Sequence, residues 1–212
     1  MLVAAAFITG CGGAARQERP TPFAGIPQHG ATLGSPRAPY TLVEFADLQC
    51  PFSARFHRDV LPAVIDRFVR TGLVRVELRP IAFLGPDSAP AAAATVAAGL
   101  QDHMWQFADL AYRHQGAENS GYVTPTFLGG LARATPGLDP DRFRRTSGSR
   151  RLISILTANA QAARTARITG TPGLRFGRTG RALAPFSQGP IERAAFLRRL
   201  SRATASASAT PR

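Results

Sequence analysis

The sequence contains little cysteine, no lysine and no long apolar run. Its two cysteines, Cys11 and Cys50, are too few for the disulfide framework of a small secreted scaffold. No apolar run approaches the roughly 18 residues of a membrane-spanning helix, which excludes an integral membrane protein of that kind. The cysteines and the four histidines lack the spacing typical of metal ligands, so we expect no metal site and no other cofactor.

The charge balance is strongly positive, with 26 arginines against 13 acidic residues and a formal net charge of +13. Such an excess favours an anionic partner, either nucleic acid or a phospholipid surface. A general bias of the sequence towards arginine, alanine and glycine explains it equally well. The arginines of residues 142–151 are candidates for a nucleic-acid patch, but the segments around Cys11 and Cys50 favour a membrane face or simple solvation. We therefore expect no nucleic-acid partner.

The first residues combine an apolar stretch with a cysteine. The run Ile8-Thr9-Gly10-Cys11 resembles the lipobox of bacterial lipoproteins. That resemblance implies cleavage before Cys11, acylation of its thiol, and a protein anchored to the outer face of the cell membrane, in an oxidising compartment. A two-chain anchor gives stable membrane binding, and the positive charge adds attraction to anionic lipid. The alternative is an ordinary apolar N-terminus.

Hydrophobic periodicity indicates a strand, a helix and a second strand in succession. Residues 40–46 (YTLVEFA) form an apolar run that predicts a buried strand. A helix begins at Pro51, is kinked by Pro62 and ends at Gly72. Residues 73–79 alternate between apolar and charged side chains, as in a half-buried strand.

The middle of the chain is predicted to be helical, and strands return only near its end. The order strand, helix, strand, helical block, strands, helix indicates an α/β domain, and its 44% hydrophobic content is enough for a core. The remaining predicted helices are 88–100, 103–112, 125–133, 139–145, 150–167 and 191–202, and the remaining strands are 173–177 and 181–186.

Cys50 lies between the first predicted strand and the helix that begins at Pro51. Proline at the first helical position costs nothing, because its missing N–H would have no partner there. The unpaired amides and the macrodipole at a helix N-terminus stabilise a thiolate by roughly 0.3 to 2 kcal/mol. We therefore expect an accessible, reactive thiol at Cys50; the alternative is a buried, inert cysteine.

Three stretches resemble one known family. The run LVEFADLQCPFSARFH resembles the active-site region of the DsbA-like branch of the thioredoxin superfamily, whose members carry Cys-Pro-x-Cys after a strand. The runs HMWQFADLAYRHQGAENSGY and ITGTPGLRFG resemble the family's inserted helical domain and its cis-proline loop. The resemblance covers about residues 38–200. It implies an α/β thioredoxin fold with a helical domain inserted at about residues 86–167.

The resemblance also implies roles for individual residues. Cys50 matches the family's nucleophile, and Glu44 matches the buried acid that moves protons to and from the second cysteine. An extended client peptide is expected to pair with the backbone before the cis-proline, as an added strand does. The residues expected to bind the client are Pro51, Phe52, Thr171 and Pro172.

Ser53 departs from the family, because it stands where the resolving cysteine belongs. Without a second thiol the site cannot store an internal disulfide. What remains is attack by one thiolate on a disulfide, giving a mixed disulfide that an outside thiol must release. Ser53 is expected to donate a hydrogen bond to the Cys50 thiolate. The alternative is that Ser53 has no function and that the protein is a degenerate enzyme.

Several of these assignments have simpler alternatives. Glu44 could be a strand-end carboxylate that faces solvent, and Thr171 and Pro172 could belong to an ordinary turn. Gly173 is expected to loosen that turn. His57 lies two helical turns beyond Cys50, which places a cation near the thiolate, but a surface histidine is the favoured interpretation.

The domain organisation follows from these segments. The boundaries are a lipoprotein signal at 1–11, a flexible linker at 12–39, a DsbA-like domain at 40–202 with its helical insertion, and a disordered tail at 203–212.

The leading function is extracytoplasmic thiol–disulfide exchange by a monothiol oxidoreductase. Cys50 would act on protein clients that carry disulfides or thiols, and an external thiol or redox partner would complete the cycle. The alternatives are a transferase that activates a low-molecular-weight thiol, and a non-catalytic module that captures clients along the Pro172 loop. The sequence does not identify the client, the redox partner or the direction of electron flow.

Overall fold

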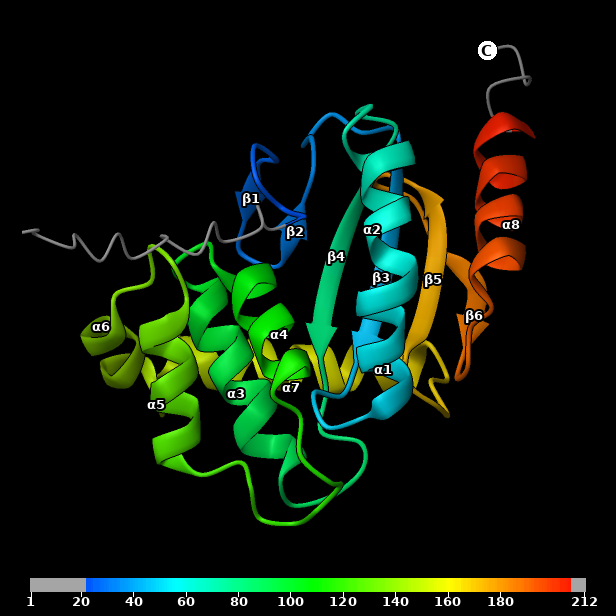
Figure 1. The fold of residues 1–212 in the computed structure, drawn as a ribbon. Helices are drawn as coiled ribbons and strands as arrows, with labels where there is room; N and C mark the ends of the chain where they lie inside the picture. Colours follow the sequence, from blue (N-terminus) through cyan, green and yellow to red (C-terminus); the bar gives the residue numbers. More distant parts are fainter. Residues whose placement is uncertain (1–21, 207–212) are drawn as a thin grey trace, which may run out of the picture.

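The molecule is built around one mixed sheet with strand order β1-β2-β4-β3-β5-β6. The computed structural model describes residues 22–206, and the candidate lipidation site Cys11 lies outside them. The helix that follows Cys50 crosses one face of the sheet, α3–α6 gather at one side, and α8 lies at the other (Figure 1). The strands are β1 (Gln28–His29), β2 (Thr32–Leu33), β3 (Tyr40–Ala46), β4 (Val74–Pro80), β5 (Gly173–Arg178) and β6 (Ala184–Gln188).

The central strand β3 carries the chain into the candidate site. All seven of its residues are buried, as its mainly apolar pattern predicts. It pairs in parallel with β4 and antiparallel with β5, so both of its edges are covered. Its carboxyl end leads through residues 47–49 directly to Cys50.

The helix after Cys50 contains π-helical turns. It consists of α1 (Pro51–Arg55), the π segment η1 (Phe56–Val60), α2 (Leu61–Val64) and the π segment η2 (Ile65–Val69). Pro62 has no N–H to donate, and the wider turn before it accommodates this loss, since the Leu61 amide bonds to the Phe56 carbonyl five residues back. The irregularity predicted at Pro62 thus takes the form of a π turn within a continuous helix.

The helical middle of the chain follows the predicted order. Side-chain oxygens of Thr124, Asp139 and Ser149 accept hydrogen bonds from first-turn amides and so cap three of these helices. On the opposite face of the sheet, Ala163 packs against Val43 and Phe45. The helices are α3 (Ser88–Gly99), α4 (Met104–Arg113), α5 (Pro125–Ala134), α6 (Pro140–Thr146), α7 (Arg150–Thr165) and α8 (Arg193–Ser206).

The predicted linker is wrong for residues 22–39, which belong to the folded domain. The short strands β1 and β2 form an antiparallel pair, and β2 extends the sheet by pairing with β4. Phe23 and Leu33 are 2% and 0% exposed. Two-residue strands are too short to show a hydrophobic period, so the segment reads as irregular in sequence although its apolar side chains are buried.

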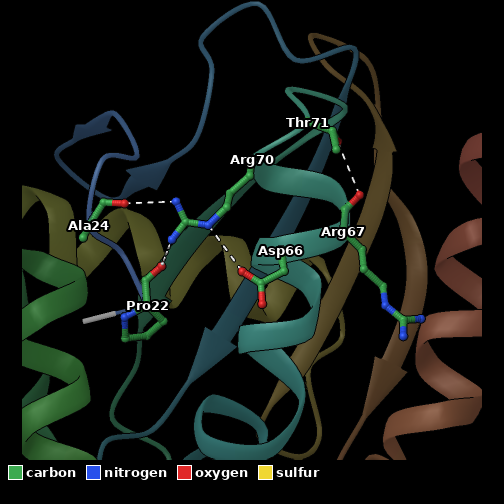
Figure 2. Close-up of polar contacts among 6 residues, drawn as sticks. All are labelled: Pro22, Ala24, Asp66, Arg67, Arg70 and Thr71. Carbon is green, nitrogen blue, oxygen red and sulfur yellow. Dashed lines mark hydrogen bonds and ion pairs between the residues drawn. The ribbon is translucent and has the colours of Figure 1, made fainter. Parts of the chain in front are cut away.

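Arg70 fastens this N-terminal segment to the helix (Figure 2). Its guanidinium donates to the carbonyls of Pro22 at 2.9 Å and Ala24 at 3.0 Å. Its Nε donates to Asp66, one helical turn earlier, at 3.3 Å. A planar group with several donors can satisfy three acceptors at once, which fixes the direction of the chain at Pro22.

The last helix is longer than predicted. It continues to Ser206, four residues beyond the predicted end at 202, so residues 203–206 are not disordered. Thr204 is 4% exposed and its hydroxyl donates to the Leu200 carbonyl at 3.0 Å. A tail of alanine and serine reads as disordered in sequence, but alanine favours helix wherever a packed side chain holds it.

Candidate active site

Cys50 occupies the junction between the sheet and the helix, as predicted. It is the N-cap of α1, with extended backbone angles of φ −75° and ψ 121°, and Pro51 follows at the start of the helix. The residue is only 4% exposed, so the expectation of an accessible thiol is wrong for this state. Its Sγ donates a hydrogen bond to the Thr171 carbonyl at 3.3 Å, which shows that the Thr171–Pro172 loop lies over the sulfur.

The loop over the sulfur contains a cis peptide bond between Thr171 and Pro172, as the resemblance implies. Strand β5 starts at the next residue, Gly173, which pairs with Phe45 of β3. Gly173 does not loosen the loop, because a Cβ at this position would lie 2.8 Å from Cγ2 of Ile168. The missing side chain instead lets the loop approach its neighbour closely.

Ser53 lies one turn after Cys50 and is fully buried. The predicted hydrogen bond from the Ser53 hydroxyl to the Cys50 sulfur is not formed in this state, in which the thiol donates to the Thr171 carbonyl. The Ser53 Oγ makes no hydrogen bond of ordinary geometry to a described residue. A buried hydroxyl without a partner carries a desolvation cost of about 1–3 kcal/mol.

Glu44 is buried, and the alternative that it faces solvent is excluded. Its side chain is 0% exposed, and its Oε2 lies 3.1 Å from Nε2 of His57, whose side chain is 1% exposed. The favoured prediction of a surface histidine at position 57 is therefore wrong. The π turn that begins at Phe56 carries His57 on the inner side of the helix, and the acid on β3 supplies its polar partner.

Tyr112 of α4 closes the other side of this buried group. Its ring lies 4.5 Å from the His57 ring, and its hydroxyl donates to the Asp47 carbonyl at 3.4 Å. Burial raises the pKa of Tyr112 well above 10, and negative charge on Glu44, Asp47 and Cys50 adds to the rise. The phenol therefore stays neutral over the physiological range and acts as a donor.

A second polar network holds the segment before Cys50 in place. The Gln49 amide donates to Ser88 at 2.7 Å and to Asn119 at 2.9 Å, and its oxygen accepts from the Asn119 backbone at 2.7 Å. These bonds tie the Cys50 turn to the helical block. Sequence reasoning missed this network, because the sequence does not show that Gln49 is buried.

Asp47 connects the same turn to the loop after β4. Its Oδ2 accepts from the amides of Phe83 at 2.8 Å and Leu84 at 2.9 Å. Phe83 is 42% exposed, and Phe52 on α1 is 43% exposed. Phe52 lies two residues after Cys50, so a large exposed apolar side chain stands close to the thiol in the chain.

No metal site or spanning helix is found within residues 22–206. No group of three or more potential ligands there could hold a metal ion. None of the helices in this part of the chain is both long and apolar enough to span a bilayer.

A family model described as Thioredoxin matches residues 28–182. The chain belongs to the thioredoxin family. The disulfide bond formation protein D of Bacillus subtilis is 28% identical over 142 residues, which are 66% of this chain and 64% of that protein. The chain thus spans somewhat less than two thirds of the length of this relative.

Solved structures agree with this assignment at the level of the fold. Oxidised BdbD from Bacillus subtilis matches with a TM-score of 0.69 at 23% identity, and the match covers 84% of this chain and 91% of the BdbD chain. Chlamydia trachomatis DsbA matches with a TM-score of 0.70 at 21% identity, and the match covers 85% of this chain and 93% of the DsbA chain. Two predictions are therefore confirmed. The fold is of the DsbA-like α/β type, and the chain is a DsbA-like member of a family of thiol–disulfide oxidoreductases.

Proposed function

We propose that this protein exchanges disulfides with protein clients through one nucleophilic thiol, Cys50. The observation that carries the proposal is the position of Cys50 at the N-terminus of α1 beneath the Thr171 carbonyl, with Ser53 one turn along. Cys50 is the single free cysteine among residues 22–206. The names of relatives such as disulfide bond formation protein D support the reaction class.

The reaction begins when the Cys50 thiolate attacks one sulfur of a client disulfide. The client S–S bond breaks, a new S–S bond joins Cys50 to the client, and the other client sulfur leaves as a thiolate. With Ser53 at the second position, release requires another thiolate. A second thiol of the same client rearranges its disulfides with no net redox change, whereas two external thiols reduce the client disulfide and are themselves oxidised.

Client binding is proposed for the surface around the sulfur. Pro51 and Phe52 are exposed at the start of α1, and Phe83 adds a second exposed ring on the loop bonded to Asp47. The Thr171–Pro172 segment precedes β5 and offers backbone to an extended peptide, a form of strand addition. Because the Thr171 carbonyl accepts the Cys50 thiol hydrogen bond, forming the thiolate also releases that carbonyl for a client amide.

The test is capture of the mixed disulfide. Insulin with its native disulfides is incubated with the protein, quenched with acid and analysed by mass spectrometry. We expect an adduct through Cys50 in the natural protein and none in Cys50→Ala. If the natural protein forms no adduct although its thiol is alkylated in the folded state, the exchange function is wrong.

A non-catalytic client-binding module is the second candidate, favoured by the exposed Phe52, two residues after a cysteine whose sulfur is buried. Binding of an unfolded polypeptide is then expected to survive Cys50→Ala and to weaken in Phe52→Ser. Cys50→Ala and Phe52→Ser therefore distinguish the two functions: exchange is lost in Cys50→Ala, whereas client binding without exchange is kept in Cys50→Ala and weakened in Phe52→Ser.

We also propose an extracytoplasmic location with a lipid on Cys11. The support is the sequence Ile8-Thr9-Gly10-Cys11, and ten residues lie between Cys11 and Pro22, which limits the distance between the two Cα atoms to about 40 Å. Mass spectrometry of the protein from membranes is expected to show a diacylated Cys11. An unmodified protein that retains residues 1–10 would refute the anchor.

A further inference from the structure

Four helices of the helical block, α3, α5, α6 and α7, enclose a cavity of about 410 Å³. The block lies on the side of the molecule opposite α8 (Figure 1). Cys50 and the Thr171–Pro172 loop lie outside the walls of this cavity, and disulfide exchange as written above makes no use of it. Small-molecule sites have volumes of about 300–1,000 Å³, so the cavity is large enough to hold a ligand.

The inner walls of the cavity are apolar. Ala97, Ala132 and Leu152 are 3%, 0% and 3% exposed and form its floor. On the α5 wall, a Cβ at Gly129 would meet Nη1 of Arg133 at 3.5 Å, an ordinary van der Waals distance, so the space in front of Gly129 can accept a larger group. An ordered water needs two to four polar partners, and alanine and leucine side chains offer it none. The interior therefore favours an apolar occupant over water.

The rim of the cavity carries positive charge. The exposed residues that border it include Arg133 of α5 and Arg144 of α6. The Arg144 guanidinium lies 3.0 Å from the Asp141 carboxylate, but the two side chains are 76% and 65% exposed, and an exposed ion pair of this kind contributes little. Arg133 has no acidic partner within residues 22–206. Both guanidinium groups can therefore bind an anion at the entrance.

The surroundings of the rim add to this charge. Residues 133–151 contain six arginines and two acidic residues, Asp139 and Asp141. The Asp139 side chain caps α6 by accepting hydrogen bonds from the amides of Asp141 and Arg142 at 2.8 and 3.0 Å, so part of its charge is already engaged. The excess of positive charge attracts anions towards the entrance and opposes the approach of cations. The other exposed arginines of this segment are Arg142, Arg145, Arg150 and Arg151.

We propose that this cavity binds a single-chain amphiphile with an anionic head group, of the fatty-acid class. The alkyl chain lies against the apolar floor, and the carboxylate at the rim accepts hydrogen bonds from the guanidinium groups of Arg133 and Arg144, whose planar geometry suits a carboxylate. A helix about 10 Å across would fill 410 Å³ within about one turn, so the cavity suits a slender chain better than a helical peptide. This inference does not depend on Cys50 being the exchanging thiol.

The first test needs no change in the cavity. Isothermal titration calorimetry measures the Kd of saturated carboxylates from octanoate to dodecanoate, on the full chain with Cys11→Ser so that it carries no acyl chain of its own. Each CH₂ group that enters the cavity is expected to tighten binding about fourfold until the cavity is filled. An alkyltrimethylammonium ion of the same length is expected to bind about tenfold more weakly, because the rim arginines repel it. No binding, or equal affinity for all chain lengths or for both head groups, would overturn the proposal.

The second test fills the cavity with Gly129→Leu and uses Gly130→Leu as the matched control. Gly130 is the next residue of α5, lies outside the cavity walls, and has no described atom within 4 Å of the position of a Cβ. Gly129→Leu is expected to weaken decanoate binding by about tenfold or more, because the leucine side chain takes the place of several CH₂ groups, whereas Gly130→Leu leaves it unchanged. Equal decanoate affinity in the two folded variants would show that the ligand does not enter this cavity, and the proposal would be wrong.

The head group and the source of the ligand are tested separately. Replacing both rim arginines, with Arg133→Gln and Arg144→Gln, is expected to weaken decanoate binding about tenfold and to leave decanol binding unchanged. An equal loss for both ligands would refute the anionic head group. Vesicles of phosphatidylglycerol are expected to bind Gly129→Leu and Gly130→Leu equally, because surface charge alone attracts them. If Gly129→Leu alone loses vesicle binding, the ligand is a membrane phospholipid and the fatty-acid assignment is wrong.

Discussion

Restoring the second cysteine with Ser53→Cys tests whether the site is built for a dithiol. A helix rise of 1.5 Å and a radius of about 2.3 Å place Cα atoms three residues apart at about 5 Å. That distance lies within the range of roughly 4.4–6.8 Å that a disulfide requires. Cys50 is an N-cap in extended conformation, which leaves its sulfur free to turn towards position 53.

The energetics of this substitution follow from the burial of Ser53. The serine hydroxyl is fully buried and lacks a hydrogen bond, so exchanging it for a less polar thiol recovers part of a cost of about 1–3 kcal/mol. The larger sulfur costs about 1 kcal/mol or more in a packed core. Closing the four-residue loop then stabilises the oxidised form by about 2 kcal/mol through loss of chain entropy.

The assay compares free thiols and activity in the two proteins. The variant is expected to lose both thiols from residues 22–206 on mild oxidation and to oxidise a reduced client, because a resolving thiol at high effective concentration outcompetes an external one. The natural protein is expected to accumulate mixed disulfides. If Ser53→Cys keeps two free thiols under oxidising conditions while remaining folded, the site is not arranged for disulfide exchange as we describe it.

Three further substitutions test separate parts of the structure. Gly173→Ala places a Cβ 2.8 Å from Ile168 and should lower the free energy of unfolding by about 1–3 kcal/mol in urea titrations, whereas the control Gly130→Ala, which meets no atom within 4 Å, should raise it by about 0.5–1 kcal/mol. Arg70→Ala removes the hydrogen bonds to the N-terminal segment, so limited proteolysis should cut residues 22–26 faster than in the natural protein. Equal rates would show that the β1–β2 pair holds this segment without Arg70. Burial raises the pKa of Tyr112 above 10, so its contribution to stability is present below pH 10 and is lost as the pH rises through the folded value. Tyr112→Phe should flatten that alkaline decline in pH-dependent unfolding, and an unchanged slope would contradict it.

The sequence predicted the central strand, the helix after Cys50 and the positions of the helical block well, because each has a strong local pattern. Residues 40–46 are apolar except for Thr41 and Glu44, and Pro51 marks a helix start that depends only on its missing N–H. The predictions failed where the local pattern was weak. The residues of β1 and β2 read as a linker, and the end of α8 read as a disordered tail.

The surroundings of the sulfur were predicted less completely than its position. Sequence reasoning selected Glu44 and Pro172 through a resemblance, but it treated His57 as a surface residue and passed over Gln49. Both are polar residues in otherwise ordinary positions, and nothing local distinguishes a buried histidine from an exposed one. Their partners lie on β3 and on the segments that carry Ser88 and Asn119.

The sequence alone therefore determined that a cysteine stands at a helix N-terminus with serine in place of a second thiol, since both facts depend on residues within one turn. Only the tertiary structure decided that Cys50 is covered, because Thr171 lies 121 residues away and approaches through the pairing of β5 with β3. The same holds for the Glu44–His57 pair, which forms because the helix packs across the strand that precedes it. Long-range contacts of this kind arise from packing, and no local propensity encodes them.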